Sequence, residues 1–175
     1  MTPLQRIAMG LVIVVLDTRT PWDLLPDVLG WLLVLAGIAV LPVPDRGTLR
    51  TSAVVAALVS VVVFPPQVHE PLAGADPSLR WVADLPDLAF AFLLTRSLGR
   101  VAAEAGDRRT AGRMRVLLTV VTVLAIAPVL VFAAGAEHLL PAATVLVQVM
   151  WIWLVWNLFA AHARPYATEG TGTGS

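Results

Sequence analysis

Residues 21–42 read PWDLLPDVLGWLLVLAGIAVLP, an acidic and aromatic opening followed by a long apolar run. The Leu25-Pro26 pair begins that run, and no charged residue occurs from Val28 to Leu41. About 20 helical residues of this kind cross a hydrocarbon core about 30 Å thick. The stretch therefore predicts a helix that spans a membrane.

Two later stretches repeat this pattern. Trp81–Leu98 reads WVADLPDLAFAFLLTRSL and His138–Leu154 reads HLLPAATVLVQVMWIWL, and in each a Leu-Pro pair begins an apolar segment. The recurrence is compatible with three parallel repeats. We favour chance, because proline is common in a first helical turn, where its missing N–H would have no helical partner.

The composition of the whole chain agrees with a membrane protein. Hydrophobic residues make up 58% and charged residues 14% of the 175 residues, whereas soluble domains carry about 25% charged residues. Helices that are apolar all round belong in a large core or in lipid. A chain of this length has no core large enough to enclose several such helices, so we expect lipid to surround them.

The same composition excludes several chemistries. The chain contains no cysteine, which removes disulfides, thiolate nucleophiles and iron–sulfur ligation. Lysine is also absent, which removes Schiff-base chemistry and the P-loop lysine. No nucleotide-binding or nucleophile-elbow motif occurs, so we expect no cofactor, no catalytic residue and no nucleic-acid partner.

We predict an all-α integral membrane bundle of six transmembrane helices, arranged as three helical hairpins. The expected spans are residues 4–20, 24–41, 49–66, 80–98, 114–134 and 139–161. Residues 1–165 would form one transmembrane domain, and the Gly- and Thr-rich residues 166–175 a disordered cytoplasmic tail. No A-x-A-like cleavage site follows the first span, so we expect that span to be retained.

Arginine predicts the orientation of these spans. With the N-terminus inside, ten of the twelve arginines fall on one side and only Arg19 and Arg80 on the other. Eight of the twelve acidic residues lie opposite the ten arginines. Positive charge in short loops marks the cytoplasmic side. Both termini are therefore expected in the cytoplasm of a multi-pass plasma-membrane protein.

Five aspartates are expected near the outer ends of the helices: Asp17, Asp23, Asp27, Asp84 and Asp87. Asp27 and Asp87 each follow a proline in what we take to be a first helical turn. A carboxylate there complements the positive end of the helix dipole, typically by about 0.3–1 kcal/mol. We favour this capping interpretation, and the alternative is an acidic outer vestibule that attracts cations.

A second set of candidates is polar and lies near the expected membrane midplane: Ser60, Gln148 and Thr144. Thr119 and Thr122, with Ser60, are possible hydrogen-bond partners of Gln148. Such bonds usually hold helices together, and a substrate pathway is the alternative interpretation. Pro128 is expected to kink its helix, since it deprives the Leu124 carbonyl of its helical partner.

The remaining candidates are arginines, tryptophans and two loop pairs. Arg108, Arg109, Arg113 and Arg115 are expected to bind anionic lipid head groups, at about 1 kcal/mol for each arginine. Trp22 and Trp81 would lie in an outer aromatic belt, whereas Trp151, Trp153 and Trp156 would fill gaps or face lipid. His69-Glu70 and Glu137-His138 are expected to be solvated loop residues, so we predict no metal site.

The sequence DLLPDVLGWLL, Asp23 to Leu33, resembles a motif of small, uncharacterised multi-span bacterial membrane proteins. In that motif an acidic residue, Leu-Pro-Asp, two apolar residues and a Gly-aromatic pair open the second helix. The resemblance implies a protein of the bacterial cytoplasmic membrane. It assigns no activity and no catalytic residues.

Two functions compete on this evidence, and a membrane enzyme comes third. The first is a non-catalytic scaffold or accessory component, with a membrane-protein partner or a second copy of the chain. Its basis is that the expected midplane carries few polar residues, all of them neutral. The alternative is a small cation- or proton-coupled transporter or channel, which would use the outer aspartates to attract its substrate.

Overall fold

Every regular element in the described part of the chain is helical. The structure, a computed structural model, describes residues 1–17, 27–63 and 77–164. Within these ranges, six side chains are not described: Leu16, Asp17, Asp27, Pro77, Arg80 and Glu137. The α-helices are α1 (Pro3–Asp17), α2 (Asp27–Ala39), α3 (Arg46–Val63), α5 (Pro77–Glu104), α6 (Arg108–Ala133) and α7 (Leu140–Ala161), and the short 3-10 helix η1 (Glu137–Leu139) precedes α7.

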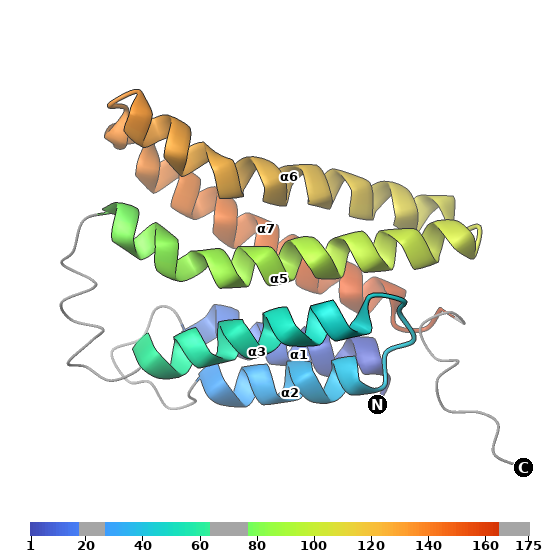
Figure 1. Cartoon of the computed structure of the whole chain (residues 1–175). Helices are drawn as coiled ribbons and strands as arrows, with labels where there is room; N and C mark the ends of the chain where they lie inside the picture. The colour runs from blue at the N-terminus through green and yellow to red at the C-terminus, as the bar shows by residue number, and fades with distance from the viewer. Residues whose placement is uncertain (18–26, 64–76, 165–175) are drawn as a thin grey trace, which may run out of the picture.

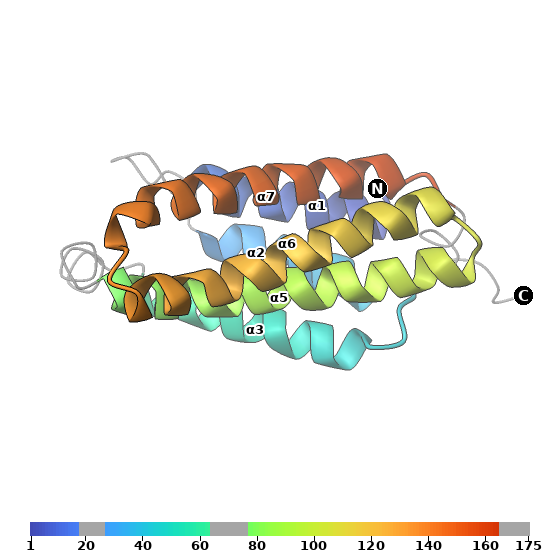
Figure 2. The same ribbon diagram turned by 90° about the horizontal axis from the view of Figure 1, so that it is seen from above.

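The six helices lie side by side along a common axis and form a closed ring (Figures 1 and 2). Going round the ring, α1 packs on α2, followed by α3, α5, α6 and α7, and α7 packs back on α1. The order of the helices in the ring is therefore their order in the chain. Helices that are consecutive in the chain are thus neighbours in space.

Three of the helices, α3, α6 and α7, are long and apolar enough to cross a membrane. The described parts of α1 and α2 are apolar but shorter, with 15 and 13 residues. Helix α5 has 28 residues and is interrupted by charge at Asp84, Asp87, Arg96 and Arg100. The predicted all-helical architecture is confirmed. The predicted ends at residues 18–20, 24–26 and 64–66 lie outside the described residues.

The Leu-Pro pairs do not occupy equivalent positions in their helices. Helix α5 begins at Pro77, so Pro86 lies inside the helix, beyond its first two turns. Pro141, by contrast, lies at the very start of α7. The prediction that Asp87 lies in a first helical turn was therefore wrong. The field of a helix terminus is felt only within the first turn, so capping does not explain this aspartate.

Glycines bring α1 and α2 into backbone contact. A Cβ atom added to Gly30 would lie 2.7 Å from the carbonyl oxygen of Gly10, and one added to Gly37 would lie 2.8 Å from that of Pro3. Neither gap accepts a methyl group. Gly30 and Gly37 therefore allow the two helices to approach closely, and such small residues are the usual means by which helices pack in lipid.

Trp31 connects its own helix, α2, to α3 and α5 in the interior of the ring. Its indole is fully buried, and its ring lies edge-on to Phe90 of α5, with the ring centroids 5.2 Å apart. The Nε1–H donates a hydrogen bond to the Ser60 hydroxyl of α3, over 3.1 Å. The pairing satisfies the polar edge of a large side chain that the core needs for its volume.

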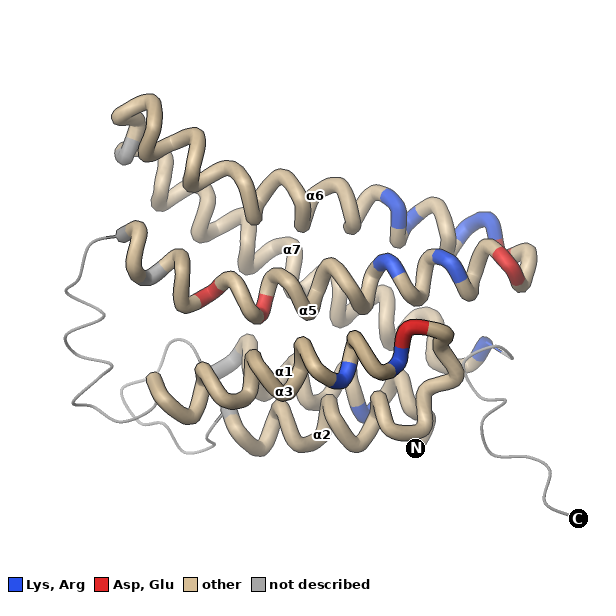
Figure 3. Tube along the Cα trace, viewed as in Figure 1, with Lys and Arg blue, Asp and Glu red and all other residues tan. Residues whose placement is uncertain are grey.

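All ten arginines whose side chains are described lie toward one end of the ring, here called the arginine end (Figure 3). Arg46 donates to the carbonyl of Ala39 at the end of α2, and Arg100 pairs with Asp45 over 2.8 Å. Arg164, just after α7, lies 3.5 Å from Asp107 in the turn between α5 and α6. These contacts link connections and helix ends that are distant in sequence.

Asp107 also caps α6. One carboxylate oxygen accepts from the Thr110 backbone N–H over 3.1 Å, and the other accepts from the Thr110 hydroxyl over 2.8 Å. Its side chain is only 15% exposed, whereas those of Asp45 and Arg100 are 42% and 48% exposed. Exposed ion pairs contribute about 0–1 kcal/mol. Asp107 is therefore the stronger anchor at the arginine end.

We expect Gly30→Ala to lower the free energy of unfolding by about 1–3 kcal/mol, the usual range for an overpacked contact. The added methyl group would press on the Gly10 carbonyl, which is backbone and cannot turn away. Denaturation of the purified protein in detergent would measure the change.

Gly112→Ala is the matched control for this variant. Gly112 lies in α6, and a Cβ atom there would meet nothing within 4 Å. The control should be neutral or more stable by up to about 1 kcal/mol, since alanine favours a helix more than glycine does. Equal stability of the two variants would contradict the proposed backbone contact.

We also expect Asp107→Ala to lower stability by about 0.5–2 kcal/mol, the typical effect of losing a helix cap. Asp45→Ala should have a smaller effect, because it removes only an exposed ion pair. Thermal unfolding of both variants in the same detergent would compare them. A larger loss for Asp45→Ala would show that the α2–α3 connection, and not the cap, fixes this end.

Candidate functional site

Asp84 and Asp87 line a cavity between α1, α5, α6 and α7. Its volume is about 320 Å³. The acidic residues of α5 that line it lie toward the far end of the ring, the end opposite the arginines (Figure 3). Asp84 and Asp87 are the eighth and eleventh residues of α5. They therefore line the wall of the cavity and do not lie at the helix terminus.

Polar groups of α7 face these aspartates across the cavity. Thr144 and Gln148 are one turn apart on α7 and both line it. The Thr144 hydroxyl donates to the Leu140 carbonyl over 3.1 Å, and its oxygen lone pairs remain able to accept. Gln148 supplies an amide that can both donate and accept. The cavity thus offers two carboxylates, a hydroxyl oxygen and an amide.

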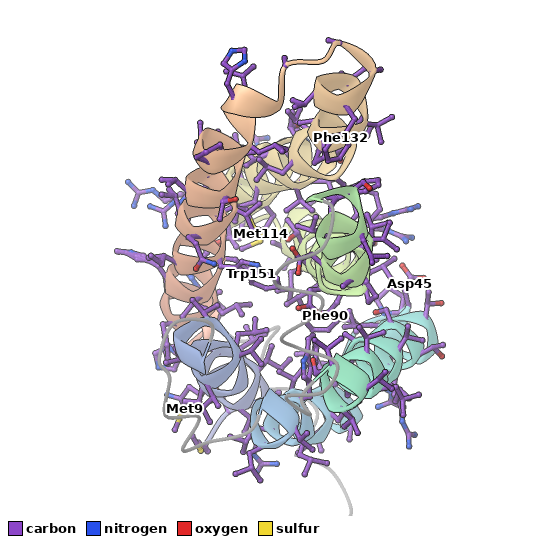
Figure 4. All side chains as sticks on the ribbon, turned by 90° about the vertical axis from the view of Figure 1, so that its left-hand side faces the viewer. Met9, Asp45, Phe90, Met114, Phe132 and Trp151 are labelled. Carbon is purple, nitrogen blue, oxygen red and sulfur yellow. The ribbon has the colours of Figure 1, made fainter. Side chains whose placement is uncertain are left out.

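Two tryptophans complete the wall. Trp151 lies one turn beyond Gln148, and about two turns beyond Thr144, on α7. It is 6% exposed and projects toward the interior of the ring (Figure 4). Trp81 contributes from α5, and its Nε1 atom is buried without a hydrogen-bond partner in the described part of the chain. Indole rings beside carboxylates attract organic cations, because the ring face is electron-rich.

Helix α6 contributes Leu124 and Pro128 to the cavity. The helix continues through Pro128, which has no N–H to offer the Leu124 carbonyl. This carbonyl is therefore a further oxygen acceptor near the cavity. Backbone carbonyls freed by proline inside the membrane are tolerated where other groups or a cavity take over their pairing.

The floor of the cavity, on the side of the arginine end, is apolar. The innermost lining residue of each helix is Val14 in α1, Leu88 in α5, Leu124 in α6 and Trp151 in α7. Their exposed fractions are 6%, 3%, 6% and 6%. We call these four side chains the floor. Beyond it the buried side chains are mainly hydrophobic, with a few polar ones such as Thr95 among them.

The structure brings together residues from two separate sets of predicted sites. Asp84 and Asp87 come from the acidic set, and Thr144 and Gln148 from the midplane set. Asp23 lies outside the described residues. Asp17 ends α1 and Asp27 begins α2, but neither side chain is described.

Ser60 does not belong to this site. Its hydroxyl accepts the hydrogen bond of Trp31 on the far side of the core. The other expected partners of Gln148 are also engaged elsewhere, since Thr119 donates to the Arg115 carbonyl and Thr122 to the Leu118 carbonyl. The prediction that these hydroxyls pair with Gln148 was wrong. Gln148 turns to the cavity instead.

Arg108, Arg109, Arg113 and Arg115 lie on the first turns of α6, with exposed side chains (Figure 3). They form a basic surface at the arginine end, well separated from the cavity. Among the described residues, no three His, Asp or Glu side chains come together in a way that could hold a metal ion. His69 and Glu70 lie outside the described residues.

Sequence reasoning missed the role of both tryptophans. Trp151 was expected to fill a gap or face lipid and Trp81 to lie in an interfacial belt, yet both line the cavity. The helical spacing of Thr144, Gln148 and Trp151 was the available signal, because these residues share one face of α7. Trp156, on another face, is 53% exposed, as expected for a side chain that meets lipid.

The chain matches no protein-family model, no curated protein and no solved structure. The function must therefore be argued from the cavity and from the distribution of charge. Together these features describe a mainly apolar, aromatic-lined recess that carries four polar side chains from α5 and α7 and has hydrophobic residues at its inner side.

Proposed function

We propose that all six helices cross a bacterial plasma membrane, with both termini in the cytoplasm. The helices run along a common axis, and the arginines whose side chains are described gather toward one end of them (Figure 3). The positive-inside rule makes that end cytoplasmic. The cavity then opens toward the outside. The resemblance of Asp23–Leu33 to a bacterial motif supports the same location.

Anionic lipid is the partner proposed for the arginine end. Arg108, Arg109, Arg113 and Arg115 are exposed there and lie where the head groups of the inner leaflet would be. Each arginine near an anionic surface contributes about 1 kcal/mol. This interaction would fix the depth of α6 in the membrane, and it specifies no soluble partner.

The function we propose is binding and transport of a small organic cation. The observation that carries it is the meeting of Asp84, Asp87, Thr144 and Gln148 in one cavity with Trp81 and Trp151. Carboxylates would attract the positive charge, and indole faces would stabilise it once water is displaced. A cavity of about 320 Å³ falls at the small end of ligand sites.

The cavity is the reason to prefer this function to a scaffold. Polar and ionisable residues inside a membrane are costly and mark substrate or ion pathways. A scaffold gains nothing from carboxylates and amides turned toward a recess inside its own ring. A transporter needs such a recess, open to one side and closed to the other. The floor provides the closed side in this conformation.

The topology predicts the behaviour of fusion proteins. Alkaline phosphatase fused after Arg164 should be inactive and a fluorescent protein at that position should fluoresce, because the C-terminus would be cytoplasmic. Phosphatase fused after Val63, at the end of α3, should be active. An active phosphatase after Arg164 would refute the orientation.

The cavity predicts binding of a cation through Asp84 and Asp87. Phenyltrimethylammonium should quench the tryptophan fluorescence of the protein in lipid nanodiscs, and the uncharged isostere tert-butylbenzene should not. Asp84→Asn and Asp87→Asn should each weaken binding about tenfold, equivalent to about 1.4 kcal/mol. Uptake of the cation by proteoliposomes should fall in parallel.

Asp45→Asn is the matched control, because it removes a carboxylate at the arginine end, away from the cavity. It should leave both binding and uptake unchanged. Equal binding of the cation and its uncharged isostere would contradict a role for the aspartates. Binding without any uptake would leave a receptor or accessory component as the function.

A further inference from the structure

Thr95 of α5 is a polar residue that does not line the cavity. It is fully buried, and its hydroxyl oxygen has no hydrogen-bond partner among the described residues. Burying a hydroxyl without a hydrogen-bond partner lowers stability. Such a group is rare in a native structure and calls for a physical reason.

Other threonines in the helices of this protein avoid that cost. Thr51, Thr119, Thr122 and Thr144 each donate to the carbonyl four residues earlier, over 2.8–3.1 Å. The same bond is open to Thr95, whose equivalent acceptor would be the carbonyl of Ala91. Thr95 does not make this bond, so its hydroxyl has no partner within its own helix.

The position of Thr95 relates it to the cavity. It follows Asp84 by three turns of α5, which places it within about 20° of Asp84 around the helix and about 16 Å deeper. It also lies about 10 Å beyond Leu88, the residue that α5 contributes to the floor. Ala91, a small buried residue, lies between Leu88 and Thr95 on the same face.

We propose that Thr95 is the second polar contact of the transported cation, on the cytoplasmic side of the floor. This inference rests on the proposed transport function and extends the path along one face of α5. The floor would act as the gate between an outer station at Asp84 and Asp87 and an inner station at Thr95.

The two stations differ in charge, which suits capture of the cation from outside and its release to the cytoplasm. The outer station carries charge and would capture a cation from water. The inner station offers one neutral hydroxyl oxygen, which replaces a water molecule of the hydration shell without holding the ion tightly. Conduction requires sites that are favourable enough to enter and weak enough to leave.

Cysteine substitution tests this placement directly, because the chain contains no cysteine of its own. A Thr95→Cys variant in proteoliposomes should react with a trimethylammonium methanethiosulfonate reagent, since the path must admit cations of this kind. Ala53→Cys is the control. Ala53 is equally buried but lies in α3, which contributes nothing to the cavity.

The labelling should be at least tenfold faster for Thr95→Cys than for Ala53→Cys, and excess phenyltrimethylammonium should slow it. Equal rates for the two variants would overturn the inference. This readout does not depend on transport, so it separates the two proposals. Labelling without any uptake by the wild-type protein would refute the transport function and leave Thr95 on an accessible path.

A second series separates binding from passage. Thr95→Val should lower uptake at least tenfold and leave fluorescence quenching in the cavity unchanged, while Thr95→Ser should restore uptake. Thr122→Val is the matched control, because that hydroxyl is already bonded to the Leu118 carbonyl. Thr95→Val should also be no less stable than the wild type, since it removes an unpaired hydroxyl. Unchanged uptake in Thr95→Val would overturn the role of Thr95.

Discussion

The backbone contact of α1 with α2 is the constraint on which the ring depends. Gly10 and Gly30 let the two helices meet without side chains between them, and Gly37 extends the contact toward Pro3. In lipid there is little hydrophobic force between helices, so close packing has to hold them together. Helix α1 also closes the ring against α7 and contributes Val14 and Val15 to the cavity. The shape of the cavity is thus tied to a contact on the other side of α1.

The two halves of the ring differ in how their interiors are packed. Toward α2 and α3 the interior is filled by large side chains, and the one indole N–H of Trp31 is paired with Ser60. Between α5, α6 and α7 the far end keeps polar groups around open space, and the arginine end is fixed by a helix cap and ion pairs. Dense packing gives stability, whereas the open half keeps groups available for a ligand. Such a division lets a small protein hold a polar recess without losing its fold.

The apolar runs predicted the all-helical architecture, because hydropathy is a local property of sequence. The orientation read from the arginines stays a prediction. The packing of Trp31 against Phe90 and Ser60 was not predicted, because it depends on how α2 meets α5 and α3. Only part of the site could be predicted from the sequence. Asp84, Asp87, Thr144 and Gln148 were each recognised as polar residues in apolar surroundings, but their meeting depends on α7 facing α5 across the ring. The predicted start of α5, residue 80, is close to the observed start at Pro77, but Asp87 was still taken for a first-turn residue, because Leu85-Pro86 looks like a helix opening while the helix continues through it.

The helices follow one another around the ring in the order in which they are synthesised, and this has a consequence for biogenesis. If the six helices enter the membrane one after another, as proposed, each helix finds its predecessor as its neighbour, so the bundle can grow by lateral addition. The contact between the first and the last helix forms at the final step, when α7 meets α1. Until then the inner face of α1 is open to lipid, and the recess has no wall on one side. The polar site therefore comes into existence only after synthesis of the transmembrane part is complete.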